Sequence, residues 1–159
     1  REVLDKVAEI SHWGNAPEGR FQGIAVHESF HSVVAEVVEV SMENGTAKLE
    51  KAYCAIHCGR AINPDIVHQQ LEGGMLFGLT AALKGEITLK DGAVEQGNFH
   101  DYPVLRMNEA PEVIVAIVDS DAPPTGVGEP ATPPAPAALA NALFAATGKR
   151  QRSLPLQLG

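Results

Sequence analysis

The first part of the chain alternates between apolar and polar positions in a way that predicts one helix followed by a hairpin. Over residues 3–13 the apolar positions recur at helical spacing, and the glycine- and proline-containing segment 14–19 ends that pattern. From Ile24 to Val40 the chain is rich in valine and alternates with period two, which predicts a single strand. Asn44-Gly45 favours a tight turn because both residues tolerate positive φ, so we expect a hairpin over residues 24–58.

A long helix is predicted to begin just after Asn63. The Asn63 side chain can cap it, Pro64 suits the first helical position because its missing N–H is not needed there, and the pattern continues to about Leu83. Small residues follow Gln70 at four-residue intervals and form a stripe: Gly74, Gly78 and Ala82. Tight packing on a neighbouring element explains this stripe better than a bound ligand does.

The later segments predict a second hairpin, a short strand and a last helix. The hairpin covers residues 86–96 around Asp91-Gly92, residues 98–111 are irregular, and residues 113–118 form an apolar strand. We expect Thr132 to cap the last helix and Gly148 to end it.

Together these elements predict one domain of the α+β class, with antiparallel hairpins packed against helices. Hairpins require antiparallel pairing, and the strands and helices alternate without a regular βαβ period. With 159 residues, of which 45% are hydrophobic, the chain is long and apolar enough to form a single core. We expect one domain over 1–159, made of a helix and linker at 1–20 and a core at 21–159.

Charge and composition exclude several classes of function. Twelve Lys and Arg against twenty Asp and Glu give a formal charge of −8, so nucleic acid is not an expected partner. No apolar run approaches the roughly 18 residues that a membrane span requires. Cys54 and Cys58 lie about 13 Å apart in an extended chain, beyond the limit of about 7 Å for a disulfide. The first residues resemble neither a signal peptide nor a natural start, so we expect the true N-terminus upstream, and the compartment stays open.

The residues His27-Glu28-Ser29-Phe30-His31 match the H-E-x-x-H pattern of zinc hydrolases. That chemistry needs two histidines one turn apart on a helix, with the glutamate as general base. In an extended chain the two imidazoles are about 13 Å apart, too far to share one ion. We therefore interpret them as strand histidines, and a zinc hydrolase remains an alternative only if this segment is helical.

Glu129 is the ionisable residue with the most constrained surroundings. Gly126 and Gly128 let the backbone pass close to a ligand, and Pro130 confines Glu129 to extended conformations. The free N–H groups of the helix that follows carry partial positive charge, which suits a carboxylate base or an anionic ligand. From these residues alone, a solvated glutamate in a glycine-proline loop is still favoured over a catalytic one.

Three motifs stand in a characteristic order along the chain. They are Cys58-Gly59-Arg60-Ala61-Ile62-Asn63-Pro64, then Gln70-Leu71-Glu72-Gly73-Gly74 with Phe77-Gly78-Leu79, and finally Gly126-Val127-Gly128-Glu129-Pro130. Their order and separations resemble the C-terminal part of the molybdenum-binding subunit of the xanthine dehydrogenase/aldehyde oxidase family. The segments 98–111 and 145–150 are similar to the isoquinoline 1-oxidoreductase/aldehyde dehydrogenase type of beta subunit, and the resemblance extends from about Phe21 to Pro155.

The resemblance implies a molybdenum hydroxylase that oxidises aldehydes or N-heteroaromatic compounds. In such enzymes molybdopterin, commonly as the cytosine dinucleotide, holds the molybdenum, and no protein side chain ligates the metal. A water-derived hydroxyl is transferred to the substrate while hydride passes to a sulfido ligand, and Glu129 would be the general base. The resemblance also implies that Gln70 contacts the cofactor and that Gly126 and Gly128 let the backbone approach it.

The same resemblance implies partners that this chain does not contain. Molybdenum subunits of this family are much longer, so we expect the rest of the subunit upstream of Arg1 and expect this chain alone to be inactive. A partner subunit would carry iron–sulfur clusters, for which this chain lacks four clustered thiolates. A small molecule would be the substrate, and its identity stays open. The alternative from a different class is a non-catalytic partner-binding or scaffold domain with the same fold.

Overall fold

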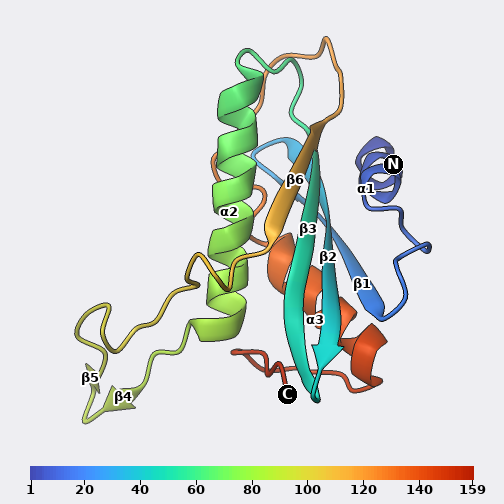
Figure 1. Cartoon of the computed structure of the whole chain (residues 1–159). Coiled ribbons are helices and arrows are strands. Elements are labelled where there is room, and N and C mark those ends of the chain that lie inside the picture. Colours follow the sequence, from blue (N-terminus) through green and yellow to red (C-terminus); the bar gives the residue numbers. More distant parts are fainter.

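The computed structural model describes residues 1–159, which form three helices and six strands (Figure 1). The helices are α1 (Glu2–Ile10), α2 (Pro64–Lys84) and α3 (Pro134–Thr147). The strands are β1 (Arg20–Ser29), β2 (Ser32–Glu43), β3 (Thr46–His57), β4 (Leu89–Lys90), β5 (Ala93–Val94) and β6 (Glu112–Ile117). None of the helices combines the length and the apolar character needed to cross a bilayer.

Four strands form one mixed sheet in the order β1-β2-β3-β6. Strands β1, β2 and β3 are antiparallel neighbours, whereas β6 pairs parallel with β3. A parallel pair needs a crossover, and here the crossover contains α2 and the segment that follows it (Figure 1). The α+β class with antiparallel hairpins is confirmed. The parallel strand β6 adds an edge strand to the sheet beside β3.

The valine-rich segment from Ile24 to Val40 is two strands, so the prediction of a single strand there is wrong. Strand β1 ends at Ser29 and β2 begins at Ser32. The turn between them is Phe30-His31, with φ of 54° and 61°. Non-glycine residues seldom adopt positive φ, and Phe-His is not a recognised turn signal, so the alternating pattern continues through the turn without a visible break.

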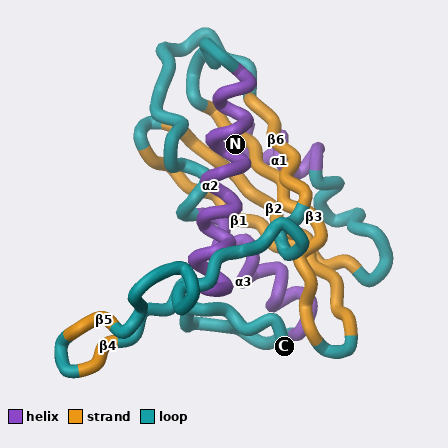
Figure 2. The backbone as a smooth tube through the Cα atoms, turned by 60° about the vertical axis from the view of Figure 1, so that its left-hand side comes forward, coloured by secondary structure: helices purple, strands orange, loops and turns teal.

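The two turns that glycine marks are confirmed. Asn44-Gly45 joins β2 to β3 with φ of 52° and 85°, and Asp91-Gly92 joins β4 to β5 with φ of 51° and 81°. Both pairs have the positive φ that two-residue hairpin turns need. The segment 85–111, which contains β4 and β5, extends away from the sheet as an arm (Figures 1 and 2).

Three of the four helix ends that the sequence predicts for α2 and α3 are confirmed. The Asn63 side chain accepts the Ile66 N–H at 3.2 Å and caps α2, which ends one residue beyond the predicted Leu83. Gly148 ends α3 with φ of 71°. The prediction that Thr132 caps α3 is wrong, because the helix begins later and the Thr132 hydroxyl is already bonded to another helix, as described below.

Each face of the sheet carries its own hydrophobic core. On one face α3 packs against β1 and β2, and α2 packs against α3, β6 and β3, with Leu71, Met75, Leu139 and Leu143 among the buried side chains. On the other face Val3 and Val7 of α1 pack against Ala35 and Val37 of β2 and against residues of β3 that include Tyr53. The loops that precede α2 and α3 are therefore positioned by the larger core, and the candidate site lies on that side.

One carboxyl group lies inside the larger core. Glu36 of β2 is fully buried, and neither of its carboxyl oxygens has a hydrogen-bond partner at normal distance. Its pairing partner on the adjacent strand β3 is Cys54, whose thiol is buried and free. Burial raises the pKa of Glu36 well above its usual value of 4.5, and burial likewise raises the pKa of the Cys54 thiol. Burial therefore favours the protonated, neutral form of both groups.

Replacing Glu36 by methionine is expected to stabilise the fold at neutral pH. A carboxyl whose pKa is raised by folding keeps its proton only in the folded state. The free energy of unfolding therefore falls as pH rises from 4.5 towards the folded-state pKa. Glu36→Met should abolish this fall and add about 1–3 kcal/mol at neutral pH, the cost of an unsatisfied buried polar group.

Urea unfolding at acidic and at neutral pH measures this effect. Glu28→Gln, at an exposed position of β1, is the control and should keep the pH dependence of the parent chain. An equal fall of the unfolding free energy in Glu36→Met and in the control would contradict the assignment of the pH dependence to Glu36.

Candidate functional site

A cavity of about 640 Å³ opens where three segments distant in the sequence meet. These segments are the end of β1 with its turn, the middle of α2, and the loop before α3. The lining residues are Ser29, Phe30, Gln70, Gly73, Gly74, Phe77, Gly128, Glu129, Thr132 and Pro133. The fold therefore brings Gln70, Gly128 and Glu129 to one cavity, whereas Gly126 is not among the lining residues.

Glu129 lies in the irregular loop 121–133, and its side chain is exposed at the cavity. Its backbone carbonyl accepts the N–H of Thr132 at 2.8 Å, which turns the chain towards α3. Within the chain its carboxylate has no hydrogen bond or ion pair. The carboxylate is therefore free to accept a hydrogen bond or a proton from a ligand.

The N-terminus of α3 offers fewer donors to an anion than the sequence pattern suggests. The helix begins at Pro134, and Pro136 follows within the same turn. Neither proline has a backbone N–H, so Ala135 and Ala137 supply the remaining donors of the first turn. The carboxylate of Glu129, rather than the helix end, is the main polar feature on this side of the cavity.

Gln70 projects from the first half of α2, and its side-chain amide is exposed and unbonded within the chain. An amide offers both a donor and an acceptor, so it can hydrogen-bond a polar ligand without regard to the ligand's charge. Next to it, Gly73 has no atom within 4 Å of the position that a Cβ would take. The backbone of α2 is thus open to the cavity at this point.

The small-residue stripe of α2 packs against the chain just before and within α3. A Cβ at Gly78 would lie 2.5 Å from the Thr132 carbonyl oxygen and 2.9 Å from the Ala135 Cβ. A Cβ at Gly74 would lie 3.4 Å from the Thr132 Oγ1, and the Thr132 hydroxyl donates to the Gly74 carbonyl at 3.1 Å. The prediction that the stripe serves packing is confirmed, and Thr132 connects α2 to the Glu129 loop.

The two glycines before Glu129 have different surroundings. A Cβ at Gly126 would lie 2.7 Å from the Phe30 Cβ, so the missing side chain lets the loop pass the β1–β2 turn. A Cβ at Gly128 would meet nothing within 4 Å, and this residue lines the cavity. Close approach to a ligand is open to the backbone at Gly128, and at Gly126 it stays a prediction.

The H-E-x-x-H residues run along the end of β1 and into its turn. His27 lies in β1 opposite Val34, and His31 is an exposed turn residue with positive φ. The separation of the two imidazoles that we expected for one extended segment does not apply, because the β1–β2 turn interrupts that segment. The helix on which this zinc motif depends is nevertheless absent, and no group of three or more His, Cys, Asp or Glu side chains is placed to hold a metal ion.

The cavity contains residues that sequence reasoning did not identify. Phe30 and Phe77 are 56% and 68% exposed, and both line it. The Ser29 hydroxyl oxygen also belongs to a lining residue and has no hydrogen-bond partner in the chain. An exposed phenylalanine beside the glycines of α2 was a usable signal, whereas the turn that presents Ser29 and Phe30 left none.

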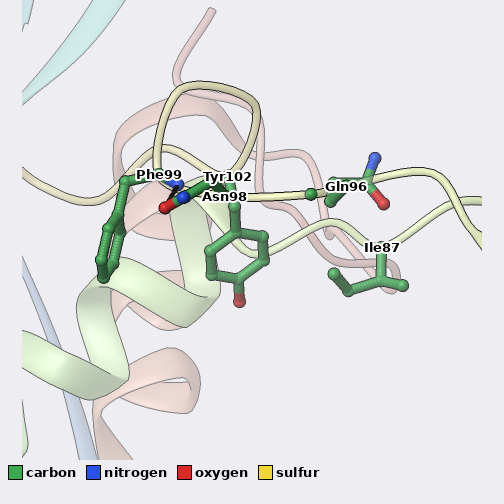
Figure 3. A pocket seen from close by; sticks show the side chains of 6 residues that line it. Ile87, Gln96, Asn98, Phe99 and Tyr102 are labelled. Carbon is green, nitrogen blue, oxygen red and sulfur yellow. Dashed lines mark hydrogen bonds between the residues drawn. The ribbon is translucent and has the colours of Figure 1, made fainter.

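A second hollow, of about 290 Å³, lies on the arm (Figure 3). Its lining consists of Ile87, Gln96, Gly97, Asn98, Phe99 and Tyr102. These side chains offer amides, a phenol and apolar surface, but no carboxylate. None of them lines the cavity at Glu129, so we take the larger cavity as the candidate site.

The chain is similar to proteins that carry molybdenum cofactors. Residues 8–111 match the family model described as the molybdopterin cofactor-binding domain. The chain is 34% identical over 161 residues to the isoquinoline 1-oxidoreductase subunit beta of Brevundimonas diminuta, and the match covers 98% of this chain. It covers 21% of that relative, so the chain spans about a fifth of its length.

Solved structures share the fold. Quinoline 2-oxidoreductase from Pseudomonas putida 86 matches 78% of this chain and 17% of its own, with a TM-score of 0.67 and 24% identity. The aldehyde oxidoreductase from Desulfovibrio desulfuricans ATCC 27774 matches 78% of this chain and 14% of its own, with a TM-score of 0.63 and 26% identity.

Proposed function

The chain belongs to the molybdopterin cofactor-binding domain family, and from this premise we propose that it is part of a molybdenum hydroxylase subunit in which Glu129 is the general base. The observation that carries the proposal is the meeting of Gln70, Gly128 and Glu129 at one cavity. Gln70 and Glu129 are 59 positions apart in the sequence and lie on different elements, yet the fold brings them together.

The chemistry of the lining residues fits a molybdenum cofactor that brings its own metal ligands. The cavity offers an amide at Gln70 and a carboxylate at Glu129, but no thiol or imidazole. These groups can hydrogen-bond a large polar ligand, and they are a poor set for binding a metal ion directly. When bound, molybdopterin supplies the metal centre for substrate oxidation.

Each residue has a separate part in the proposal. The Gln70 amide binds the cofactor by hydrogen bonds, and the open backbone at Gly73 and Gly128 leaves room for close approach. Gly126 contributes by letting the loop pass Phe30. Glu129 accepts a proton at a carboxylate oxygen, which its freedom from internal partners allows.

The finer parts of the proposal concern the complete enzyme. We propose the cytosine dinucleotide form of molybdopterin, an iron–sulfur partner subunit, and an aldehyde or an N-heteroaromatic compound as substrate. Relatives named as subunits of oxidoreductases support a multi-subunit enzyme. The domain 1–159 would act together with the rest of its subunit and would be inactive alone.

Elemental analysis tests the proposal. The protein is expressed from its complete reading frame with its partner subunits, and molybdenum and zinc are measured by inductively coupled plasma mass spectrometry. We expect stoichiometric molybdenum. Its absence, under conditions in which a control molybdoenzyme is loaded, would favour a non-catalytic scaffold domain. Stoichiometric zinc in its place would likewise contradict the proposal.

A further inference from the structure

Three hydrogen bonds join the β1–β2 turn to the loop that carries Glu129. The Ser32 Oγ lies 2.6 Å from the Gly126 carbonyl oxygen and 2.7 Å from the Thr125 Oγ1. The Gly126 N–H donates to the Phe30 carbonyl at 3.2 Å. Ser32 is fully buried, so water cannot readily replace these partners.

The donor and the acceptor in each of these hydroxyl hydrogen bonds follow from the single proton that each hydroxyl group carries. A carbonyl oxygen can only accept, so the single Ser32 hydroxyl proton is donated to Gly126. Thr125 must then donate its own hydroxyl proton to the Ser32 oxygen. Neither hydroxyl can rotate away without leaving a partner unpaired, which makes this connection specific.

Near Glu129, Val127 and Ala131 pack against the larger core, and the loop has few other hydrogen bonds. The Thr125 N–H donates to the Cys58 carbonyl at 3.0 Å on the upstream side. The contacts of Thr132 with Glu129 and Gly74 restrain the downstream side. Between these points the turn supplies the only hydrogen bonds to the loop. Because the Glu129 carboxylate has no internal partner, its place depends on the backbone that these bonds hold.

We propose that Ser32 is a positioning residue that sets the location of the Glu129 carboxylate through its bonds to Gly126 and Thr125. The turn also contributes Ser29 and Phe30 to the cavity wall, so the same bonds fix the separation of its two sides. The inference rests on the proposed function, since it gives Ser32 a part in placing the catalytic base.

Hydrogen–deuterium exchange of the complete enzyme tests the physical connection. Ser32→Ala and Thr125→Val, which is nearly isosteric, should speed amide exchange in residues 125–129 about fivefold or more. Thr125→Ser keeps the hydroxyl and should retain the parent rate. Ser41→Ala is the matched control, because Ser41 lies at the far end of β2 and donates to Glu50 at 2.7 Å.

Steady-state kinetics per bound molybdenum test the positioning role. For Ser32→Ala and Thr125→Val we expect kcat to fall about tenfold while KM stays within about twofold, since a misplaced base slows the chemical step. Thr125→Ser and Ser41→Ala should keep the parent kcat. A residue that only stabilises the fold would lower the loaded fraction but not kcat per molybdenum.

The outcomes separate this inference from the proposed function. Unchanged exchange of residues 125–129, or unchanged kcat per molybdenum, in Ser32→Ala overturns the inference, while a Glu129→Gln variant without turnover leaves the proposed function standing. If Ser32→Ala does not fold, Thr125→Val carries the same test at a less buried position. Full turnover by Glu129→Gln would overturn both.

Discussion

The Glu129→Gln variant of the complete enzyme is expected to retain its molybdenum and to lose turnover by about 10²- to 10⁴-fold, the usual contribution of a general base. Glutamine has nearly the same size as glutamate and still forms hydrogen bonds, but it cannot accept a proton at the same position. Because the Glu129 carboxylate has no partner within the chain, the substitution breaks no internal contact and should not disturb the loop.

The measurement pairs kcat with the molybdenum content of the same preparation. Glu28→Gln is the matched control, since Glu28 is also an exposed glutamate and does not line the cavity. Turnover close to that of the parent in Glu129→Gln would remove the catalytic role. Loss of molybdenum together with turnover would instead give Glu129 a part in holding the cofactor.

The Gly23→Ala variant is expected to lose about 3 kcal/mol or more of unfolding free energy, at the upper end of the cost of overpacking. A Cβ at Gly23 would lie 2.1 Å from the Ala142 nitrogen and 2.2 Å from the Ala138 carbonyl oxygen, both in the α3 backbone. Backbone atoms in a helix cannot rotate aside as side chains do, so the whole of α3 would have to move away from β1.

Urea unfolding of Gly23→Ala and Gly73→Ala measures this contact. Gly73 lies in α2 with nothing within 4 Å of its Cβ position, so alanine there should raise helix stability by up to about 1 kcal/mol. We expect the free energy of unfolding to fall in Gly23→Ala and to rise in Gly73→Ala. A Gly23→Ala chain as stable as the parent would show that β1 and α3 are not in backbone contact.

The position of Gly23 also matters for the candidate site. Helix α3 begins shortly after Glu129, and the Asn141 side chain donates to the Ile24 carbonyl at 3.0 Å, beside Gly23. Displacing α3 would therefore also displace Thr132 and the loop. A glycine inside a strand is a known sign of close backbone approach, but only the tertiary structure shows that α3 is the element that approaches Gly23.

The helix ends and glycine turns could be predicted because their causes lie within a few residues. Asn63 caps α2 through its own side chain, and Gly148 ends α3 because it tolerates a left-handed backbone. Asn44-Gly45 forms its turn for the same backbone reason. Such local preferences are properties of the sequence and need no partner elsewhere in the chain.

The turn at Phe30-His31 and the role of Thr132 depend on contacts across the fold. The turn forms where Gly126 and Thr125 of a distant loop bond Phe30 and Ser32, although its residues disfavour positive φ. Thr132 lies beside Gly74 of α2 and bonds its carbonyl instead of capping α3. No local pattern could indicate partners that lie 58 or more positions away in the chain.

The candidate site also depends partly on local sequence and partly on contacts that only the tertiary structure creates. The sequence by itself determined most of the elements, the motif residues Gln70, Gly128 and Glu129, and the resemblance to one family, since these depend on residue type and spacing. Only the tertiary structure decided that the three residues share a cavity and that Ser29 and Phe30 complete its wall. It alone connected Ser32 to the Glu129 loop, because a hydrogen bond between distant segments exists only after the sheet and helices have packed.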